Sequence, residues 1–312
     1  MASKKWSMPA AWLLVSLWFF GCATFQEGEA RIPIKGLKFQ TVDGWKLHVE
    51  TMGDEGETLL FLHGYSSTLA EWNAVAPGLC RHHRCILVDL PGFGWSDKFE
   101  GDYSPEALAE KLSRLLEIMN VQSAHVIAHS WGASIALALA HAHPEQVDRL
   151  VLVGGWVFYD QLPTVMLWSR VPVVGEFIYT VFFDEQPEMK YEQIYYEPNK
   201  HVSEQEVEYM RIFLDWEGVK RAALQAARDQ RLEDTEKIYP EVAQRSLLIW
   251  GEEDQVSYPF YGKRLHAELP DSKLVMFPRC GHVPHLEAPD LFVTTVLGFL
   301  RSSRSVAGEV TP

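Results

Sequence analysis

The sequence predicts an α/β protein with a mostly parallel central sheet, helices on both faces and an inserted helical cap. Two observations predict this fold. Short apolar, β-prone runs alternate with helical patterns between residues 37 and 154, and again between residues 246 and 300. The stretch between them, residues 156–237, is rich in aromatic side chains and contains no clear buried strand. We therefore assign residues 31–155 and 238–305 to the sheet domain and residues 156–237 to the cap.

The first elements combine a hairpin with buried strands. Residues 37–42 and 45–51 alternate in polarity and are joined by Asp43-Gly44, a strong hairpin signal. A helix is expected at residues 71–79. Another is expected from Ser104 to Asn120, because Ser104-Pro105-Glu106 combines a cap, a first-turn proline and an acid. Continuous apolar runs predict strands buried on both faces at 58–62, 85–88, 124–128 and 149–153.

The sheet pattern resumes after the cap. Strands are predicted at residues 246–250 and 273–277, followed by a closing helix at residues 291–300. In parallel sheets with helices on both faces, chemistry takes place at the carboxyl ends of the strands. Polar, turn-rich sequences follow three early strands there, at His63-Gly64, Asp89 and Ser130.

The most informative stretch is Val126 to Ala133. An apolar strand stops at Ser130, and the Ala/Leu-rich run from Ser134 to Ala142 follows directly. This predicts a strand, a sharp turn and a helix, and the small residues Ala128 and Gly132 allow the turn to close. The pattern resembles the nucleophile elbow, G-x-S-x-G, of the α/β-hydrolase family, with Ala128 in place of the first glycine. A serine that merely caps a helix would look similar in isolation.

A serine nucleophile needs a base and an anion that orients the base. Asp254 lies after the strand at 246–250, in a Gly-x-x-Asp loop that resembles the family's acid loop, and we read its neighbours Glu252 and Glu253 as solvated. His282 follows the last strand in a loop that resembles the family's Gly-His loop. His285 competes with it, but we expect a structural role there. The resemblance thus implies a triad of Ser130, His282 and Asp254.

Other site residues follow from the same resemblance. The backbone N–H groups of Tyr65 and Trp131 are expected to form an oxyanion hole. We expect His63 to hold its loop, Asp89 to fix the next one, and His129 to belong to the scaffold. The predicted substrate contacts are His63, Gly64, Trp156 and Phe158.

These residues predict a serine hydrolase that cleaves carboxylic esters. A serine at position 130 excludes the family's aspartate-nucleophile enzymes, the haloalkane dehalogenases and epoxide hydrolases. No dinucleotide or phosphate loop is present, and the reading needs neither metal nor cofactor. The mostly apolar segment from Val157 to Val174 favours hydrophobic esters, although its residues also serve to pack the cap.

Two alternatives stay open. One is another activity of the same fold, such as an aminopeptidase or a carbon–carbon bond hydrolase. An aminopeptidase needs an anion for the substrate ammonium, and the cap offers Asp184, Glu185, Glu188 and Glu192. The other alternative is a non-catalytic binding protein on this scaffold. Charge argues against nucleic acid as a partner, because 28 basic residues face 42 acidic ones, a net charge of −14.

The N-terminal residues 1–30 predict export to the cell envelope. Lys4 and Lys5 precede an uncharged apolar run from Pro9 to Phe20, which suits a secretory signal or an anchor. Cys22 after Gly21 resembles a bacterial lipoprotein processing site, so a lipid on Cys22, or the apolar segment itself, would attach the chain to a membrane. Such a location permits a disulfide between Cys80 and Cys85, although we favour two buried thiols.

Overall fold

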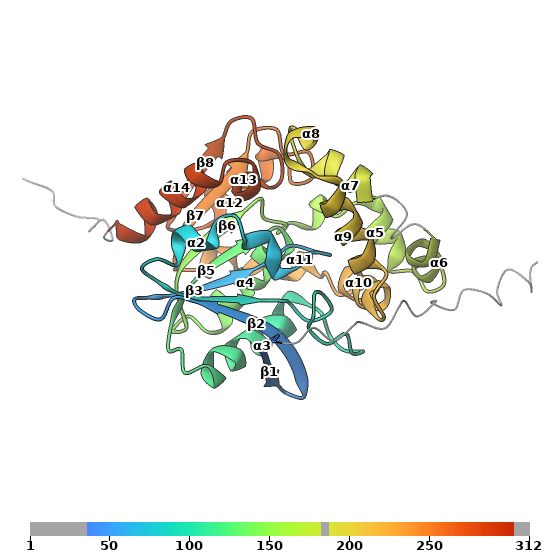
Figure 1. The fold of residues 1–312 in the computed structure, drawn as a ribbon, viewed down its shortest axis with the longest axis horizontal. Coiled ribbons are helices and arrows are strands. Elements are labelled where there is room, and N and C mark those ends of the chain that lie inside the picture. The colour runs from blue at the N-terminus through green and yellow to red at the C-terminus, as the bar shows by residue number, and fades with distance from the viewer. Residues whose placement is uncertain (1–35, 182–186, 303–312) are drawn as a thin grey trace, which may run out of the picture.

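The computed structural model describes residues 36–181 and 187–302, without the side chains of residues 187–189. Its centre is one eight-stranded sheet in the order β1-β2-β4-β3-β5-β6-β7-β8 (Figure 1). Strands β3 to β8 run parallel to one another, while β1 and β2 form the antiparallel edge. The strands are β1 (Phe39–Val42), β2 (Trp45–Met52), β3 (Thr58–Leu62), β4 (Arg84–Val88), β5 (Ala124–His129), β6 (Val147–Val153), β7 (Arg245–Gly251) and β8 (Ser272–Phe277). This confirms the predicted mostly parallel sheet.

The central strands are covered on both faces, as their continuous apolar runs predict. In β3, Leu60 and Leu62 belong to one core cluster, while Leu59 and Phe61 belong to the other. The first face is covered by α3 (Pro105–Ile118), α4 (Trp131–Ala142) and α12 (Pro259–Glu268). The opposite face is covered by η1 (Leu69–Trp72), α2 (Ala76–Leu79), α13 (Pro284–Glu287) and α14 (Pro289–Arg301).

The segment between β6 and β7 is helical and gathers at one side of the sheet (Figure 1). Tyr65, from the loop after β3, ties this cap to the sheet: its hydroxyl donates to Ala223 O at 2.6 Å and contacts the Tyr179 hydroxyl at 2.8 Å. The helices are η2 (Tyr159–Gln161), α5 (Thr164–Ser169), α6 (Val174–Val181), α7 (Pro187–Ile194), α8 (Pro198–His201), α9 (Glu204–Leu214), α10 (Val219–Arg228), α11 (Leu232–Thr235) and η3 (Glu236–Glu241).

Two helical elements differ from the sequence prediction. The helix expected at residues 71–79 is instead two short pieces, η1 and α2. Thr68 caps η1, and Pro77, which has no N–H to donate, is tolerated because it lies in the first turn of α2. Helix α12 was not predicted, although Pro259 in its first turn is a recognised start signal.

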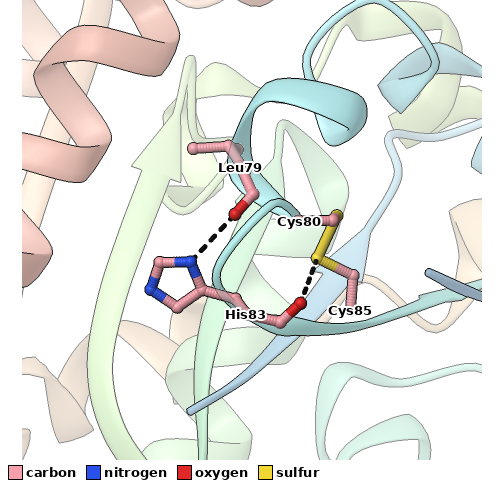
Figure 2. Close-up of a disulfide and its surroundings, with 4 residues drawn as sticks. All are labelled: Leu79, Cys80, His83 and Cys85. Carbon is pink, nitrogen blue, oxygen red and sulfur yellow. Dashed lines mark hydrogen bonds between the residues drawn. A yellow bond between two sulfur atoms is a disulfide. The ribbon is translucent and has the colours of Figure 1, made fainter. Parts of the chain in front are cut away.

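Cys80 and Cys85 form a disulfide, so the preference for two buried thiols was wrong (Figure 2). The bridge closes the turn between α2 and β4, with the two Cα atoms 5.7 Å apart. In the same turn, His83 Nδ1 donates to the carbonyl oxygen of Leu79 at 2.8 Å. The short connection brings the two sulfurs within bonding range, which hydrophobicity alone did not reveal.

The residues behind the membrane prediction lie outside the described part of the chain. These are the N-terminal apolar segment and Cys22. Within residues 36–181 and 187–302, no helix combines the length and the apolar character needed to cross a membrane.

Candidate active site

Ser130 lies at the sharp turn between β5 and α4. Its backbone has φ +50° and ψ −115°, a strained conformation for a residue other than glycine. Its N–H donates to Val153 O on the adjacent strand at 2.9 Å, which holds the turn against the sheet. Gly132 is required here, because a Cβ at that position would lie 2.7 Å from Leu62 O. The turn thus presents the Ser130 hydroxyl at the carboxyl end of the sheet.

Three of the predicted site residues meet at this point. His282 Nε2 lies 2.9 Å from Ser130 Oγ, and His282 Nδ1 lies 2.9 Å from Asp254 Oδ2. All three side chains are buried. Asp254 follows β7, and its other oxygen accepts hydrogen bonds from the N–H groups of Val256 and Ser257, both at 2.8 Å. A carboxylate can only accept, so Nδ1 carries the proton and Nε2 faces the serine hydroxyl as an acceptor.

The loop that carries His282 packs directly on the cap. The N–H of His282 donates to Ile194 O, at the end of α7, at 2.7 Å. Residue 281 must be glycine for the two segments to approach this closely, because a Cβ at that position would lie 2.5 Å from the same carbonyl oxygen. Glu287 joins the two segments by accepting from Gly281 N at 2.6 Å and from Tyr196 N at 2.8 Å. The position of His282 is therefore set by the cap as well as by the sheet.

A second loop, after β3, carries Gly64 and Tyr65. His63 Nε2 accepts from Leu90 N at 2.8 Å, so its proton is on Nδ1, which donates to Gly64 O at 2.8 Å. That carbonyl belongs to the peptide whose N–H is that of Tyr65, so His63 fixes the plane of this N–H. Trp131 is the first residue of α4, and its N–H therefore has no acceptor within the helix. These are the two N–H groups predicted to form an oxyanion hole.

Two cavities meet at Ser130. One, of about 270 Å³, is lined by the loop after β3 and by tyrosines of the cap, among them Tyr191, Tyr195 and Tyr209. The other, of about 350 Å³, is lined mainly by apolar side chains, including Trp156, Met166 and Ile178. His282 and Lys190 line both cavities. Burial lowers the pKa of Lys190 to about 8.

The predicted substrate contacts are divided by the structure. Gly64 lines the tyrosine-rich cavity and Trp156 lines the apolar one. Phe158 lines neither: its ring is fully buried against Tyr239 and Tyr261, with the Arg264 guanidinium 3.8 Å from the ring centre. His63 is also buried, and its two nitrogens bind main-chain groups. We therefore withdraw Phe158 and His63 as substrate contacts, since the first packs the cap and the second holds a loop.

Three further loop and scaffold residues have well-defined contacts. Asp89 accepts from Leu69 N at 2.7 Å and from Trp95 N at 2.8 Å, which fixes the loop after β4. His285 is fully buried, with its ring 4.7 Å from that of Trp72. His129 donates from Nε2 to His282 O at 3.0 Å, because a carbonyl oxygen can only accept. None of these three occupies the position that His282 holds beside Ser130.

Sequence reasoning missed Glu71. This residue of η1 is largely buried, and its carboxylate lies within 3.4 Å of Gly64 N and 2.5 Å from Ser67 Oγ. Its Oε1 also lies 3.2 Å from His129 Nδ1. Burial alone would raise the pKa of Glu71, but the neighbouring His129 lowers it to about 2. A glutamate at the start of an expected helix gave no signal for this role, because acids are common there.

Two side-chain groups within the described residues offer three possible metal ligands each. They are Glu71, His129 and His285 near Ser130, and Glu57, His125 and Asp148 at the other end of the strands. In both groups a carboxylate already contacts an imidazole nitrogen at 3.2 Å. Ion pairs account for these contacts, so we assign no metal to either group.

Comparisons with known proteins identify the family to which this fold belongs. Residues 59–295 match the model of the alpha/beta hydrolase family, and the chain belongs to that family. The uncharacterized hydrolase YugF of Bacillus subtilis is 30% identical over 278 residues, which is 88% of this chain and 100% of YugF. The protein is therefore a hydrolase.

Two further relatives differ in their chemistry. A 2-hydroxy-6-oxononadienedioate/2-hydroxy-6-oxononatrienedioate hydrolase of Comamonas testosteroni is 26% identical, and the match covers 84% of this chain and 96% of that protein. A thermophilic esterase from Thermogutta terrifontis superposes with a TM-score of 0.73 at 24% identity, covering 85% of this chain and 98% of the esterase. This second likeness concerns the fold alone.

Proposed function

We propose that the protein is a serine hydrolase that cleaves carboxylic esters with apolar groups, through an acyl-enzyme. The observation that carries this proposal is the pair of 2.9 Å contacts that link Ser130 to His282 and His282 to Asp254. A hydroxyl within reach of an oriented imidazole, backed by a buried carboxylate, is the arrangement that activates a serine.

In the first half of the reaction, Ser130 Oγ attacks the ester carbonyl carbon while its proton passes to His282 Nε2. The carbonyl oxygen gains negative charge, which the N–H groups of Tyr65 and Trp131 stabilise. Asp254 stabilises the imidazolium. The carbon–oxygen bond to the alcohol then breaks, and His282 returns the proton to the leaving alcohol, so the serine remains acylated.

In the second half, water replaces the alcohol. His282 takes a proton from the water as its oxygen attacks the acyl carbon, and the same N–H groups hold the oxyanion. The bond to Ser130 Oγ breaks, the proton on His282 returns to the serine, and the carboxylic acid leaves. His282 carries every proton that is transferred in the cycle. The cycle consumes one water for each ester that is cleaved.

The two cavities that meet at Ser130 support an ester with a group on each side of the carbonyl. Mainly apolar side chains line the larger cavity, so it favours a hydrocarbon group. Its volume of about 350 Å³ matches the lower end of small-molecule sites. A hydrocarbon tail in this cavity, rather than a strongly charged group, is the basis for proposing hydrophobic esters.

Labelling with a fluorophosphonate probe tests the mechanism first. We expect the probe to modify Ser130 and expect Ser130→Ala to abolish the labelling. A panel of nitrophenyl esters of increasing chain length then tests the substrate class. Turnover that rises with chain length before it declines supports the proposal, whereas no turnover of any ester rejects it.

A second candidate, hydrolysis of a carbon–carbon bond in a keto acid, is favoured by the likeness to the Comamonas hydrolase. Among the described residues that line the two cavities, Lys190 is the only lysine or arginine, which supports a monoanion better than a dicarboxylate. Turnover of a 2-hydroxy-6-oxo-dienoate with no turnover of esters would favour this candidate.

The acids predicted to serve an aminopeptidase do not support one. Of the acids proposed to hold a substrate ammonium, Asp184, Glu185 and the Glu188 side chain lie outside the described residues, and Glu192 is exposed and lines neither cavity. A non-catalytic binding role is opposed by the intact chain of hydrogen bonds from Ser130 to Asp254. Comparing ester with aminoacyl-amide turnover separates the first alternative, and probe labelling separates the second.

We also propose that the chain is exported to the cell envelope and attached to the membrane through a lipid on Cys22 or the apolar N-terminal segment. The Cys80–Cys85 disulfide supports an oxidising compartment. Lipid labelling that Cys22→Ser abolishes would support the lipid anchor, and an unmodified mature chain would reject it.

A further inference from the structure

Glu71 and His129 form a largely buried pair beside Ser130. Glu71 belongs to η1, and His129 is the last residue of β5. Their side chains are 9% and 6% exposed, and His129 Nδ1 lies 3.2 Å from Glu71 Oε1. Neither group takes part in the proton transfers proposed above, so a buried charge pair at this position requires another explanation.

The contacts define how His129 pairs with Glu71. Its Nε2 donates to His282 O at 3.0 Å and therefore carries a proton. Without a second proton, the lone pair on Nδ1 would face a carboxylate oxygen at 3.2 Å, and the two groups would repel. A proton between Nδ1 and the Glu71 carboxylate resolves this conflict and couples the two side chains. Next to the pair, burial lowers the pKa of His285 to about 3, so that ring is neutral.

The pair connects the two loops on which the proposed reaction depends. Glu71 binds Gly64 N and Ser67 Oγ, and so holds the loop that carries the Tyr65 N–H. His129 binds the carbonyl oxygen of His282, and the two imidazole rings pack with their centres 4.8 Å apart. Ser130 follows His129 directly in the chain. The ion pair therefore links the oxyanion loop, the nucleophile and the base loop through side chains.

We propose that Glu71 and His129 act as one positioning unit, whose ion pair sets the oxyanion loop and the His282 loop at a fixed separation around Ser130. Both residues line the smaller cavity at Ser130, but neither takes part in the proposed proton transfers, so the unit acts through the loops that it holds. This inference rests on the proposed function, because it assigns the pair a role in that reaction.

The primary test is Glu71→Gln, which keeps the shape of the side chain and an oxygen acceptor but removes the charge. We expect kcat to fall by about tenfold or more, with KM changed by less than about twofold, because the lost interaction acts in the transition state. A boronic acid that forms a tetrahedral adduct with Ser130 should lose affinity by the same factor as kcat/KM. A purely structural role would change the unfolding midpoint without this parallel loss.

The chain provides a matched control in Glu57→Gln. Glu57 Oε2 also lies 3.2 Å from a histidine nitrogen, His125 Nε2, and His125 is on β5 four residues before His129. This pair is at the opposite end of the strand, away from Ser130. We expect Glu57→Gln to leave kcat and boronic-acid affinity unchanged.

His129→Gln provides an independent variant in case Glu71→Gln does not fold. Glutamine can still donate to His282 O but carries no charge, and we expect the same loss of kcat. If the pair acts as one unit, the double variant loses no more activity than either single variant. Additive losses in the double variant overturn this inference but not the proposed function. The same holds if Glu71→Gln folds and keeps the kcat and boronic-acid affinity of an active wild type. A wild type without ester turnover or probe labelling overturns the proposed function, and this inference with it.

Discussion

The two ends of strand β5 carry similar side chains in different surroundings. At the amino end, His125 contacts Glu57 and Asp148 beside a cavity of about 330 Å³. At the carboxyl end, His129 contacts Glu71 beside Ser130. Both histidines are buried, and both pairs have a 3.2 Å contact, but Glu57 is 69% exposed whereas Glu71 is 9% exposed.

The difference teaches that a histidine–carboxylate pair does not identify a site. At the amino end the partners are solvated, and the cavity is lined by loop residues such as Asn120, Gln122 and Ser123. At the carboxyl end, by contrast, a strained turn, a glycine loop and the cap converge on one hydroxyl. In a parallel sheet the carboxyl ends of neighbouring strands lie side by side, so groups from distant parts of the chain come together there.

The largest expected effect is at the proposed nucleophile. Ser130→Ala should lower kcat by at least about 10⁴-fold, because the covalent step is lost. Ser123→Ala, at the opposite end of β5, should leave kcat unchanged. Steady-state kinetics on a nitrophenyl ester measure both. More than about 1% of wild-type activity in Ser130→Ala would contradict the assignment.

The next effect distinguishes two aspartates that both face an imidazole Nδ1. Asp254→Asn should lower kcat by about 10³-fold to 10⁴-fold, since His282 loses the anion that holds its tautomer. Asp148, 3.3 Å from His125 Nδ1, is the counterpart, and Asp148→Asn should retain full activity. Equal losses in the two variants would remove the functional distinction between the strand ends.

A smaller effect concerns stability against pH. The folded pKa of Glu71, about 2, is below its ordinary value of 4.5, so its charge stabilises the fold above pH 4.5, and this contribution is lost as the pH falls towards 2. This contribution amounts to about 3 kcal/mol at pH 6 and about 1 kcal/mol at pH 3, so the excess stability of wild type over Glu71→Gln should shrink by about 2 kcal/mol between these pH values. Urea unfolding at pH 6 and pH 3 measures the change.

Glu57 provides the comparison for that measurement. Its pKa is also lowered, by the hydrogen bond from His125, but the side chain is largely exposed. Solvent screening weakens such a pair. Glu57→Gln should therefore show the same sign of pH dependence with a smaller amplitude, and an amplitude equal to that of Glu71→Gln would disagree with the difference in burial.

The smallest effect on activity is expected for the disulfide before β4. Replacing Cys80 and Cys85 together by serine should cost about 2 kcal/mol of unfolding free energy, because the closed loop is short. The unfolding midpoint should fall by a few degrees. The bridge is remote from Ser130 along β4, so kcat should not change. A loss of activity in the folded variant would show that the amino and carboxyl ends of the strands are coupled.

Local signals were sufficient to predict most of the sheet. The strand at residues 58–62 matches β3 residue for residue, because an uninterrupted apolar run bounded by polar residues has one interpretation. The hairpin at Asp43-Gly44 was equally clear. The helix expected at 71–79 was wrong in its middle, because the cap at Thr68 and the break before Pro77 depend on local geometry that apolar periodicity does not encode.

The site was predictable where a residue follows a strand, and unpredictable where it depends on packing. Ser130, Asp254 and His282 each follow a strand in a turn-rich sequence, and the structure brings them together. Phe158 was misplaced, because an aromatic ring in a cap can face either a cavity or the core. Glu71 was missed because its partner His129 is distant along the chain, and only the folded sheet joins them.

The hydrogen bond from His282 N to Ile194 O has a consequence for how the enzyme admits its substrate. Separating α7 from the sheet to widen the cavities would break this bond and release the loop that holds His282, the proposed general base. A molecule with an open cap would thus be inactive, and the acyl-enzyme would form only after the cap has closed. Exclusion of bulk solvent and assembly of the base would then be one event, so turnover could be limited by cap closure and product escape.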